Sequence, residues 1–182
     1  MGLYNWRGIF QTKATDLDPK DSWNLEFDDT LEPDSPNPGW AQYIKSTSAR
    51  WFRCSQCQRS FPSNHVIVLF HMRLANGQGT VKVRRFKQNC KICKAAPMES
   101  PSVDDDNIGI LLENLVEKIR VKCYHEPPKT GGRQFVNIPV QNPHEPSHCE
   151  GCIAGICIKK APGFQSWRFC FPYHCNKLRN RL

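Results

Sequence analysis

Three pairs of cysteines, each with two residues between its members, constrain this chain more than any other feature of its 182 residues. The pairs are Cys54/Cys57, Cys90/Cys93 and Cys149/Cys152, and Cys157 follows the third pair. Two thiolates that leave one tight turn can both reach a zinc ion at about 2.3 Å. Repeated pairs of this kind predict structural zinc sites, and the number of cysteines predicts two zinc ions.

Two other roles for paired cysteines fit the chain less well. A disulfide framework is typical of secreted domains, but residues 1–20 show no basic start followed by an apolar block, so we expect no secretory signal. Thioredoxin-type redox chemistry uses one pair at a strand–helix junction, whereas three pairs occur here. We therefore expect the thiols to bind metal and not one another.

The first two pairs flank a segment that is typical of a β-hairpin. Residues 65–74 (HVIVLFHMRL) are largely apolar, residues 76–79 (NGQG) have turn chemistry, and residues 80–88 (TVKVRRFKQ) return. A hairpin brings its two ends together, so the first and second pairs should meet as the two knuckles of a zinc ribbon. Four thiolates leave no coordination position open, which predicts a structural site and not a catalytic one.

The third pair predicts a second site. Together with Cys157 it supplies three thiolates, and zinc needs a fourth ligand. His144 and His148 are both candidates, because imidazole is a common zinc ligand. An interleaved arrangement, in which the third pair joins the first or the second, stays open, and His71 would then be a possible further ligand.

Apolar residues at helical spacing predict a short helix over residues 2–15 and a longer one that follows the acidic residues 104–106. In the second helix the acidic start and the basic residues near the end match the helix dipole. Residues 126–128 (EPP) should end it.

Alternating apolar residues predict a strand over residues 20–30, and residues 134–140 are a second, short candidate strand. The three prolines and one glycine of residues 31–39 are typical of a linker. The hairpin and these elements predict an α+β fold, a small zinc-ribbon-like β-hairpin domain with zinc knuckles, packed with one N-terminal and one central helix. We assign residues 1–157 to this zinc-binding domain. Residues 158–182 form a basic and aromatic tail, which we expect to be disordered.

The basic residues are unevenly spread along the chain. Residues 51–100 carry nine basic side chains and one acidic one. Basic residues beside aromatic ones favour an alternative role, binding of single-stranded RNA, although a solvated basic face has the same pattern. The candidate RNA contacts lie on the predicted hairpin and just after it: Arg73, Lys82, Arg84, Arg85 and Lys87.

No catalytic constellation is recognisable, so we expect no enzyme. Metal would engage the paired thiolates, and Gly77-Gln78-Gly79 fits a hairpin turn better than a phosphate-binding loop. The two His-Glu pairs lack the HExxH spacing of zinc hydrolases.

Several of these motifs resemble those of the receptor-transporting proteins, within the wider group of 3CxxC-type zinc fingers. The resemblance covers about residues 3–157. It rests on WFRCSQC at 51–57, FHM at 70–72, VRRFKQ at 83–88, ENL at 113–115, and PH at 143–144 ahead of CEGC at 149–152. The resemblance favours His144 over His148 as a ligand, which completes the expected set: Cys54, Cys57, Cys90, Cys93, His144, Cys149, Cys152 and Cys157.

The resemblance implies an accessory protein and not an enzyme. It implies a role in the exit of G-protein-coupled receptors, such as odorant, taste or opioid receptors, from the secretory pathway and in their display at the cell surface. One branch of the family is linked to antiviral defence through RNA binding.

Membrane contact is the point at which this chain departs from the family pattern, which ends in a transmembrane helix. Residues 158–182 contain no apolar run long enough to span a bilayer. We therefore expect membrane contact through the receptor or through this tail, at the cytosolic face of the endoplasmic reticulum or plasma membrane.

Overall fold

The computed structural model describes residues 3–157, and the tail predicted at 158–182 lies outside the described residues. Its helices and strands follow in the order α1 (Leu3–Ala14), β1 (Ser22–Phe27), β2 (Ala41–Arg53), β3 (Ser60–Ala75), β4 (Gln78–Arg85), α2 (Asp105–Cys123), a 3-10 turn (Pro146–His148) and α3 (Glu150–Ile153). None of the helices within residues 3–157 is long and apolar enough to cross a membrane.

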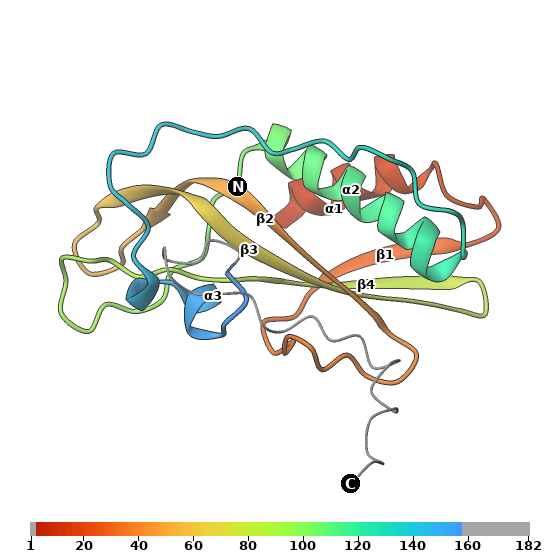
Figure 1. Cartoon of the computed structure of the whole chain (residues 1–182), viewed down its shortest axis with the longest axis horizontal. Helices are drawn as coiled ribbons and strands as arrows, with labels where there is room; N and C mark the ends of the chain where they lie inside the picture. Colours follow the sequence, from red (N-terminus) through yellow and green to blue (C-terminus); the bar gives the residue numbers. More distant parts are fainter. Residues whose placement is uncertain (1–2, 158–182) are drawn as a thin grey trace, which may run out of the picture.

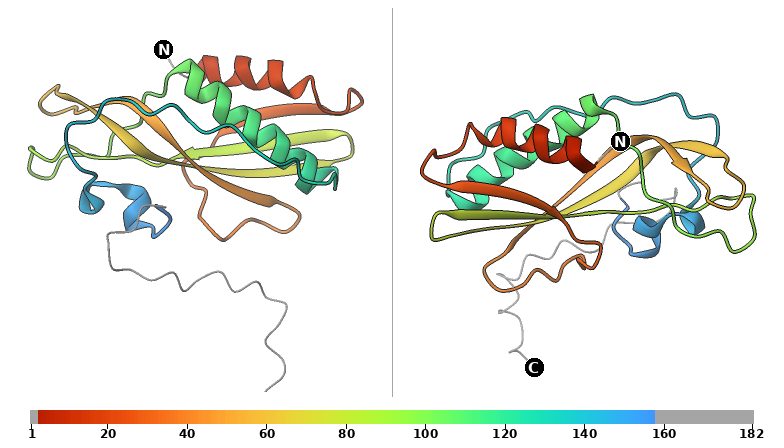
Figure 2. Two further views of the ribbon diagram at one scale, coloured as in Figure 1. Left: turned by 45° about the horizontal axis from the view of Figure 1, so that its top comes forward. Right: turned by 180° about the vertical axis from the view of Figure 1, so that it is seen from behind.

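Four strands form one mixed sheet in the order β1-β4-β3-β2. β1 runs parallel to β4, and the other neighbours are antiparallel. Figure 1 shows α1 and α2 side by side over one face of the sheet, and both views of Figure 2 place α3 on the opposite side. This arrangement confirms the predicted α+β, zinc-ribbon-like fold with one N-terminal and one central helix.

The predicted hairpin is formed by β3 and β4. Ala75 pairs with Gln78, and between them Asn76 and Gly77 adopt φ angles of 52° and 75°. Positive φ at both central residues is the geometry of a type I′ turn, which matches the twist of the flanking strands. Beyond β4 the Phe86 N–H still donates to the Ile67 carbonyl of β3 at 3.0 Å, and residues 87–89 then contact other segments.

β3 is buried on both of its faces. Val66, Val68 and Phe70 point into the main core beneath the two long helices. Ile67 and Leu69 point to the other face, where a smaller core contains Leu31 and Phe86. Burial on both sides explains why this strand reads as a continuous apolar run and not as an alternating one.

β2 is an element that the sequence analysis did not predict. Residues 41–53 form a 13-residue strand at the edge of the sheet, in a stretch for which no helix or strand was predicted. Its pairing with β3 is interrupted between Thr47 and Ala49 and again between Ala49 and Phe52. These register shifts, and a stretch of polar residues in its middle, hide the alternation by which strands are recognised.

The strand predicted over residues 134–140 is wrong. Residues 133–138, here called the strap, have no regular secondary structure and run from the end of α2 back toward α3 (Figure 1). Asn107 donates to the Val136 carbonyl at 3.0 Å and accepts from its N–H at 2.7 Å. Asn64 likewise donates to the Ile138 carbonyl at 2.8 Å and accepts from the Ile138 N–H at 3.0 Å. Side-chain amides therefore satisfy the backbone groups that a neighbouring strand would otherwise pair.

Candidate metal centres

The first centre contains the first and second cysteine pairs. The Sγ atoms of Cys54 and Cys93 lie 3.8 Å apart, and those of Cys57 and Cys90 lie 3.9 Å apart. All four sulfurs lie within 4.8 Å of one another. Four sulfurs bound tetrahedrally to one zinc ion at about 2.3 Å would be separated by about 3.8 Å. The spacing therefore fits a single zinc ion, held by four thiolates and closed to other ligands.

The ends of strands β2 and β4 position the ligands of the first centre. Cys54 directly follows β2, and its N–H donates to the Arg59 carbonyl at 2.9 Å, which closes the first knuckle. Cys90 follows β4 by a few residues. Because β3 and β4 form a hairpin, the residues before β3 and after β4 lie at the same end of the sheet.

The sulfurs of the first centre perturb one another. Backbone N–H groups of Ile92 and Cys93 lower the pKa of Cys90 to about 7, which favours a thiolate there. The pKa of Cys93 is raised to about 12, first by its contact with the Cys57 thiol and then by desolvation. Thiols this close cannot all ionise by themselves, whereas a divalent cation among them would stabilise four thiolates.

The second centre contains the third pair, Cys157 and one histidine. The Nε2 atom of His144 lies 3.1 Å from Cys152 Sγ and 3.7 Å from Cys157 Sγ. The four ligand atoms of this group lie within 4.8 Å of one another. The pKa of Cys149 is raised to about 12, first by its contact with Cys157 and then by burial. The group fits a zinc site with three thiolates and one neutral imidazole.

The other two candidate histidines lie elsewhere. His148 Nδ1 is 2.7 Å from Asn89 Oδ1, so this ring is held by a side-chain amide outside the group. His71 is 5% exposed in β3 and contacts Gln42 Oε1 at 3.3 Å. Within the described residues the third pair groups with neither of the other two, so the interleaved arrangement is not formed.

Residues 87–89 join the two centres. Gln88 pairs with Cys149 across an isolated β-bridge, and the Asn89 N–H donates to the His148 carbonyl at 3.0 Å. The carboxylate of Glu150, at the start of α3, accepts from the Lys87 N–H at 2.7 Å. Cys90, a ligand of the first centre, comes next in the chain. One short segment therefore carries a ligand of one centre and supports the second.

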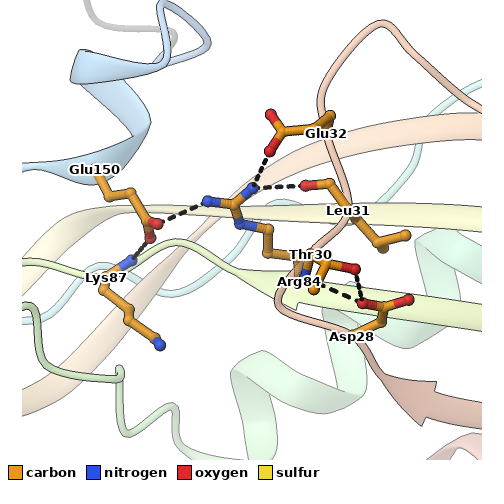
Figure 3. Close-up of polar contacts among 7 residues, drawn as sticks. All are labelled: Asp28, Thr30, Leu31, Glu32, Arg84, Lys87 and Glu150. Carbon is orange, nitrogen blue, oxygen red and sulfur yellow. Dashed lines mark hydrogen bonds and ion pairs between the residues drawn. The ribbon is translucent and has the colours of Figure 1, made fainter.

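Figure 3 shows the same carboxylate reaching a cation of the hairpin. Arg84 Nη2 lies 2.7 Å from Glu150 Oε1, and Arg84 Nη1 donates to the Leu31 carbonyl at 2.6 Å and lies 3.6 Å from Glu32. The Arg84 side chain is only 13% exposed. This ion-pair network ties α3 to β4 and to the loop that follows β1.

Two of the other candidate RNA contacts are also paired with acidic groups. Lys82 lies 3.0 Å from Asp28, and Lys87 lies 2.9 Å from Asp29. The Arg85 side chain is half-buried against aromatic rings, and only Arg73 is exposed. Acidic residues just after β1 thus neutralise a hairpin that looks strongly basic in the sequence. Most of these five basic side chains are therefore paired with acidic groups or partly buried.

Comparison with known proteins identifies the family. Residues 47–155 match the 3CxxC zinc ribbon, a zinc-binding domain, and that span includes all three cysteine pairs. Over 156 residues the chain is 36% identical to receptor-transporting protein 2 of Mus musculus, covering 83% of this chain and 69% of that protein. The chain belongs to the receptor-transporting protein family.

Other receptor-transporting proteins show the same likeness. The chain is 39% identical over 166 residues to receptor-transporting protein 3 of Mus musculus, which covers 87% of this chain but 34% of that protein. It is 34% identical over 163 residues to receptor-transporting protein 4 of Homo sapiens, covering 85% of this chain and 64% of that protein. The chain therefore spans about a third of the first of these relatives. No solved structure matches it.

The structure of this receptor-transporting protein also reveals supporting residues that sequence reasoning missed. Asn64 and Asn107 hold the strap, and Gln88, Asn89 and Glu150 hold the second centre against the first. One signal was present in the sequence, because Asn107 and Asn114 lie seven residues apart on the buried face of α2. A polar residue on an apolar helix face needs a hydrogen-bond partner, which predicts a segment packed over it.

Proposed function

We propose that this receptor-transporting protein is a zinc-stabilised accessory protein that binds G-protein-coupled receptors and promotes their display at the cell surface. The observation that carries the proposal is its likeness to receptor-transporting protein 2 over two thirds of that protein. Two clusters of four protein ligands support it, because zinc held this way shapes a binding surface and leaves no open position for a reaction. The protein therefore acts by binding and not by catalysis.

The proposed location is the cytosolic face of the endoplasmic reticulum or plasma membrane. None of the eight described cysteines is in a disulfide. Zinc thiolate centres persist in a reducing compartment, where disulfides are rare. Contact with the membrane would then come through the bound receptor or through residues 158–182.

Co-expression with tagged odorant, taste and opioid receptors tests the proposal. The chain should co-purify with at least one of these receptors from detergent extract and raise its surface level in flow cytometry. Cys90→Ser should abolish both effects, because it removes a ligand of the first centre. Cys123→Ser is the matched control, since Cys123 lies in α2 outside both groups. Absence of co-purification together with unchanged surface levels for all three receptors would refute the proposal.

The RNA-binding alternative is the weaker proposal on these contacts. Four of its five basic residues are paired with acidic groups or half-buried. A salt titration tests it directly, because binding through phosphate contacts must weaken steeply as salt rises. Affinity for single-stranded RNA that falls steeply, and that Arg73→Gln reduces, would favour the alternative.

A further inference from the structure

A pocket of ≈ 360 Å³ lies where α1, the ends of β2 and β4 and residues 98–103 meet. It is separate from both metal groups, and its size falls within the range of small ligand sites. The side chains that matter to its chemistry are two aromatic rings, two guanidinium groups and one carboxylate: Trp6, Trp51, Arg53, Arg85 and Glu99.

The pocket is held in shape by hydrogen bonds on both sides. Glu99 exchanges backbone hydrogen bonds with Gln88 at 2.9 and 3.2 Å. Ser102 accepts from the Arg50 N–H at 2.8 Å and donates to the Trp51 carbonyl at 2.9 Å. The Arg50 guanidinium lies over the Trp51 ring, 5.5 Å from its centroid. A preformed pocket loses little conformational entropy when a ligand binds.

Arg85 is the partly buried guanidinium of this pocket, whereas Arg53 is exposed and donates to Gln58 Oε1 at 3.1 Å. Among the described residues no carboxylate lies within ion-pair distance of Arg85, although Lys82, Arg84 and Lys87 on the same stretch each have one. The Nε atom of Arg85 is shielded from solvent and has no hydrogen-bond acceptor in residues 3–157. Nη1 makes only a 3.4 Å contact with the Pro101 carbonyl.

Burial makes this missing partner costly. Desolvation lowers the pKa of Arg85, and the charge of Asp29 opposes the shift without reaching ion-pair distance. A desolvated guanidinium is stabilised best by an anion that accepts two parallel hydrogen bonds. The rings of Trp6 and Phe27 lie 6.0 and 4.8 Å from the guanidinium carbon and satisfy it only in part.

We propose that this pocket binds a carboxylate side chain, Asp or Glu, from an extended segment of a partner protein, with Arg85 as the anion contact. The planar, singly charged carboxylate matches the guanidinium fork. Glu99 also lines the pocket, and its negative charge repels a phosphate dianion more strongly than a singly charged carboxylate. Trp51, which is 43% exposed, offers an apolar surface to the residue beside the carboxylate.

The charge of the chain itself favours a partner as the occupant. Residues 158–182 contain six basic and no acidic side chains, so this segment has the wrong charge for the pocket. The proposal does not depend on the receptor role, since any partner with an exposed acidic segment has the required chemistry.

The test uses the zinc-loaded full chain and a fluorescein-labelled octapeptide that contains two glutamates beside a leucine. The control peptide has glutamines in place of the glutamates. We expect the acidic peptide to bind at least tenfold more tightly in fluorescence anisotropy and to shift the indole N–H signals of Trp51 and Trp6 in NMR spectra. Equal binding of the two peptides would overturn the proposal, and so would spectra in which neither indole signal shifts.

Three variants locate the site. Arg85→Gln and Trp51→Ala should each weaken binding of the acidic peptide at least tenfold. Arg73→Gln, which removes the same charge from an exposed residue outside the pocket, should change it less than twofold. If Arg85→Gln fails to fold, Trp51→Ala and Arg53→Gln decide the question, because both alter the pocket at the end of β2. Unaltered binding by the folded variants would contradict the proposal.

Competition identifies the source of the anion. Inorganic phosphate and a twelve-residue oligouridylate should displace the labelled peptide at least tenfold less well than unlabelled acidic peptide. Stronger displacement by either competitor would refute a carboxylate site and assign the pocket to phosphate or to RNA. Receptor surface levels measured with Trp51→Ala are a separate readout, so the pocket and the receptor role can fail independently.

Discussion

At the residue scale, three asparagine side chains form the hydrogen bonds to the strap backbone that a neighbouring β-strand would form in a sheet. Asn64, Asn107 and Asn114 bind the backbone of the strap, the last through the Arg133 carbonyl at 2.8 Å. The strap leads within a few residues to His144 of the second centre. Fixing the strap therefore also limits where His144 can lie.

Replacement of Asn107 tests whether these asparagines hold the strap. Asn107→Ala removes both hydrogen bonds to Val136, and the side chain is only 3% exposed, so we expect a loss of about 1–3 kcal/mol in unfolding free energy. The Val136 amide should exchange with deuterium at least tenfold faster. Asn24→Ala, at an exposed position of β1, is the control and should change neither quantity. Unchanged exchange at Val136 would show that Asn107 does not hold the strap.

His71 predicts a pH dependence of stability. Burial lowers its pKa below the ordinary 6.5, with the charge of Asp28 opposing the shift and that of Lys82 adding to it. The unfolded chain then binds a proton at a higher pH than the folded chain does. Stability should fall as pH drops from 6.5 toward the folded pKa, and His71 should make no such contribution well above 6.5.

Thermal unfolding of zinc-loaded protein between pH 7.5 and 5.5 measures this effect. His71→Gln retains a polar group beside Gln42 but does not titrate, so its midpoint should fall less over this range than that of the unaltered chain. Zinc content determined at each pH excludes metal loss as the cause. Parallel midpoint curves would contradict the assignment to His71.

At the scale of elements, the contact between β1 and β4 depends on one glycine. Gly79 pairs with Trp23, and a Cβ atom at this position would overlap the Trp23 ring. The ring cannot move aside easily, because its Nε1 donates to Tyr124 Oη at 3.0 Å and that hydroxyl donates to Asp21 at 2.8 Å. The parallel pairing of β1 with β4 therefore requires a residue without a side chain.

Two glycine substitutions with opposite expected effects test this requirement. Gly79→Ala should destabilise the protein by about 1–3 kcal/mol through overpacking. Gly109→Ala should stabilise it by about 0.5–1 kcal/mol, because the site lies inside α2 and nothing is within 4 Å of the new methyl group. Urea unfolding in the presence of zinc gives both values. A neutral Gly79→Ala would mean that the Trp23 ring can relocate.

At the scale of the whole molecule, two metal groups and one short connection organise the end of the sheet at which β2 and β4 finish. Cys54 and Cys90 are 0% and 2% exposed, so the first group serves as a small core of its own. Residues 87–89 attach the second group to the same strand end. Zinc in the first centre should therefore also stabilise the second.

Metal stoichiometry measures this coupling. Native mass spectrometry should show two zinc ions on the unaltered chain and on Cys123→Ser, but at most one on Cys90→Ser. The zinc that Cys90→Ser retains should be removed at a lower chelator concentration, because Gln88 and Asn89 lose their anchor. Structural zinc contributes folding free energy on the order of 10 kcal/mol, so the melting temperature should also fall steeply. A variant that keeps two zinc ions would refute the ligand assignment.

Local signals in the sequence determined most of the elements. The Asn76-Gly77 turn and its flanking apolar runs predicted the hairpin, and an acidic start with two prolines after the end predicted the helix that is α2. These features depend on backbone preferences of a few neighbouring residues. The spacing of the cysteine pairs likewise carries its own chemistry, since two thiols in one turn suit one ion.

Tertiary structure decided what depends on contacts between distant segments. His144 and His148 offer the same ligand chemistry, and in the sequence only the family resemblance favoured the first. Packing gives the physical reason, because it places His144 beside Cys152 and His148 beside Asn89. Only the fold brings Asp28 and Asp29 to the cations Lys82 and Lys87. Only the fold shows that asparagine side chains, and not a neighbouring strand, pair with the backbone of the strap. Most of these pairings join residues tens of positions apart, and their free energy depends on geometry that no local pattern contains.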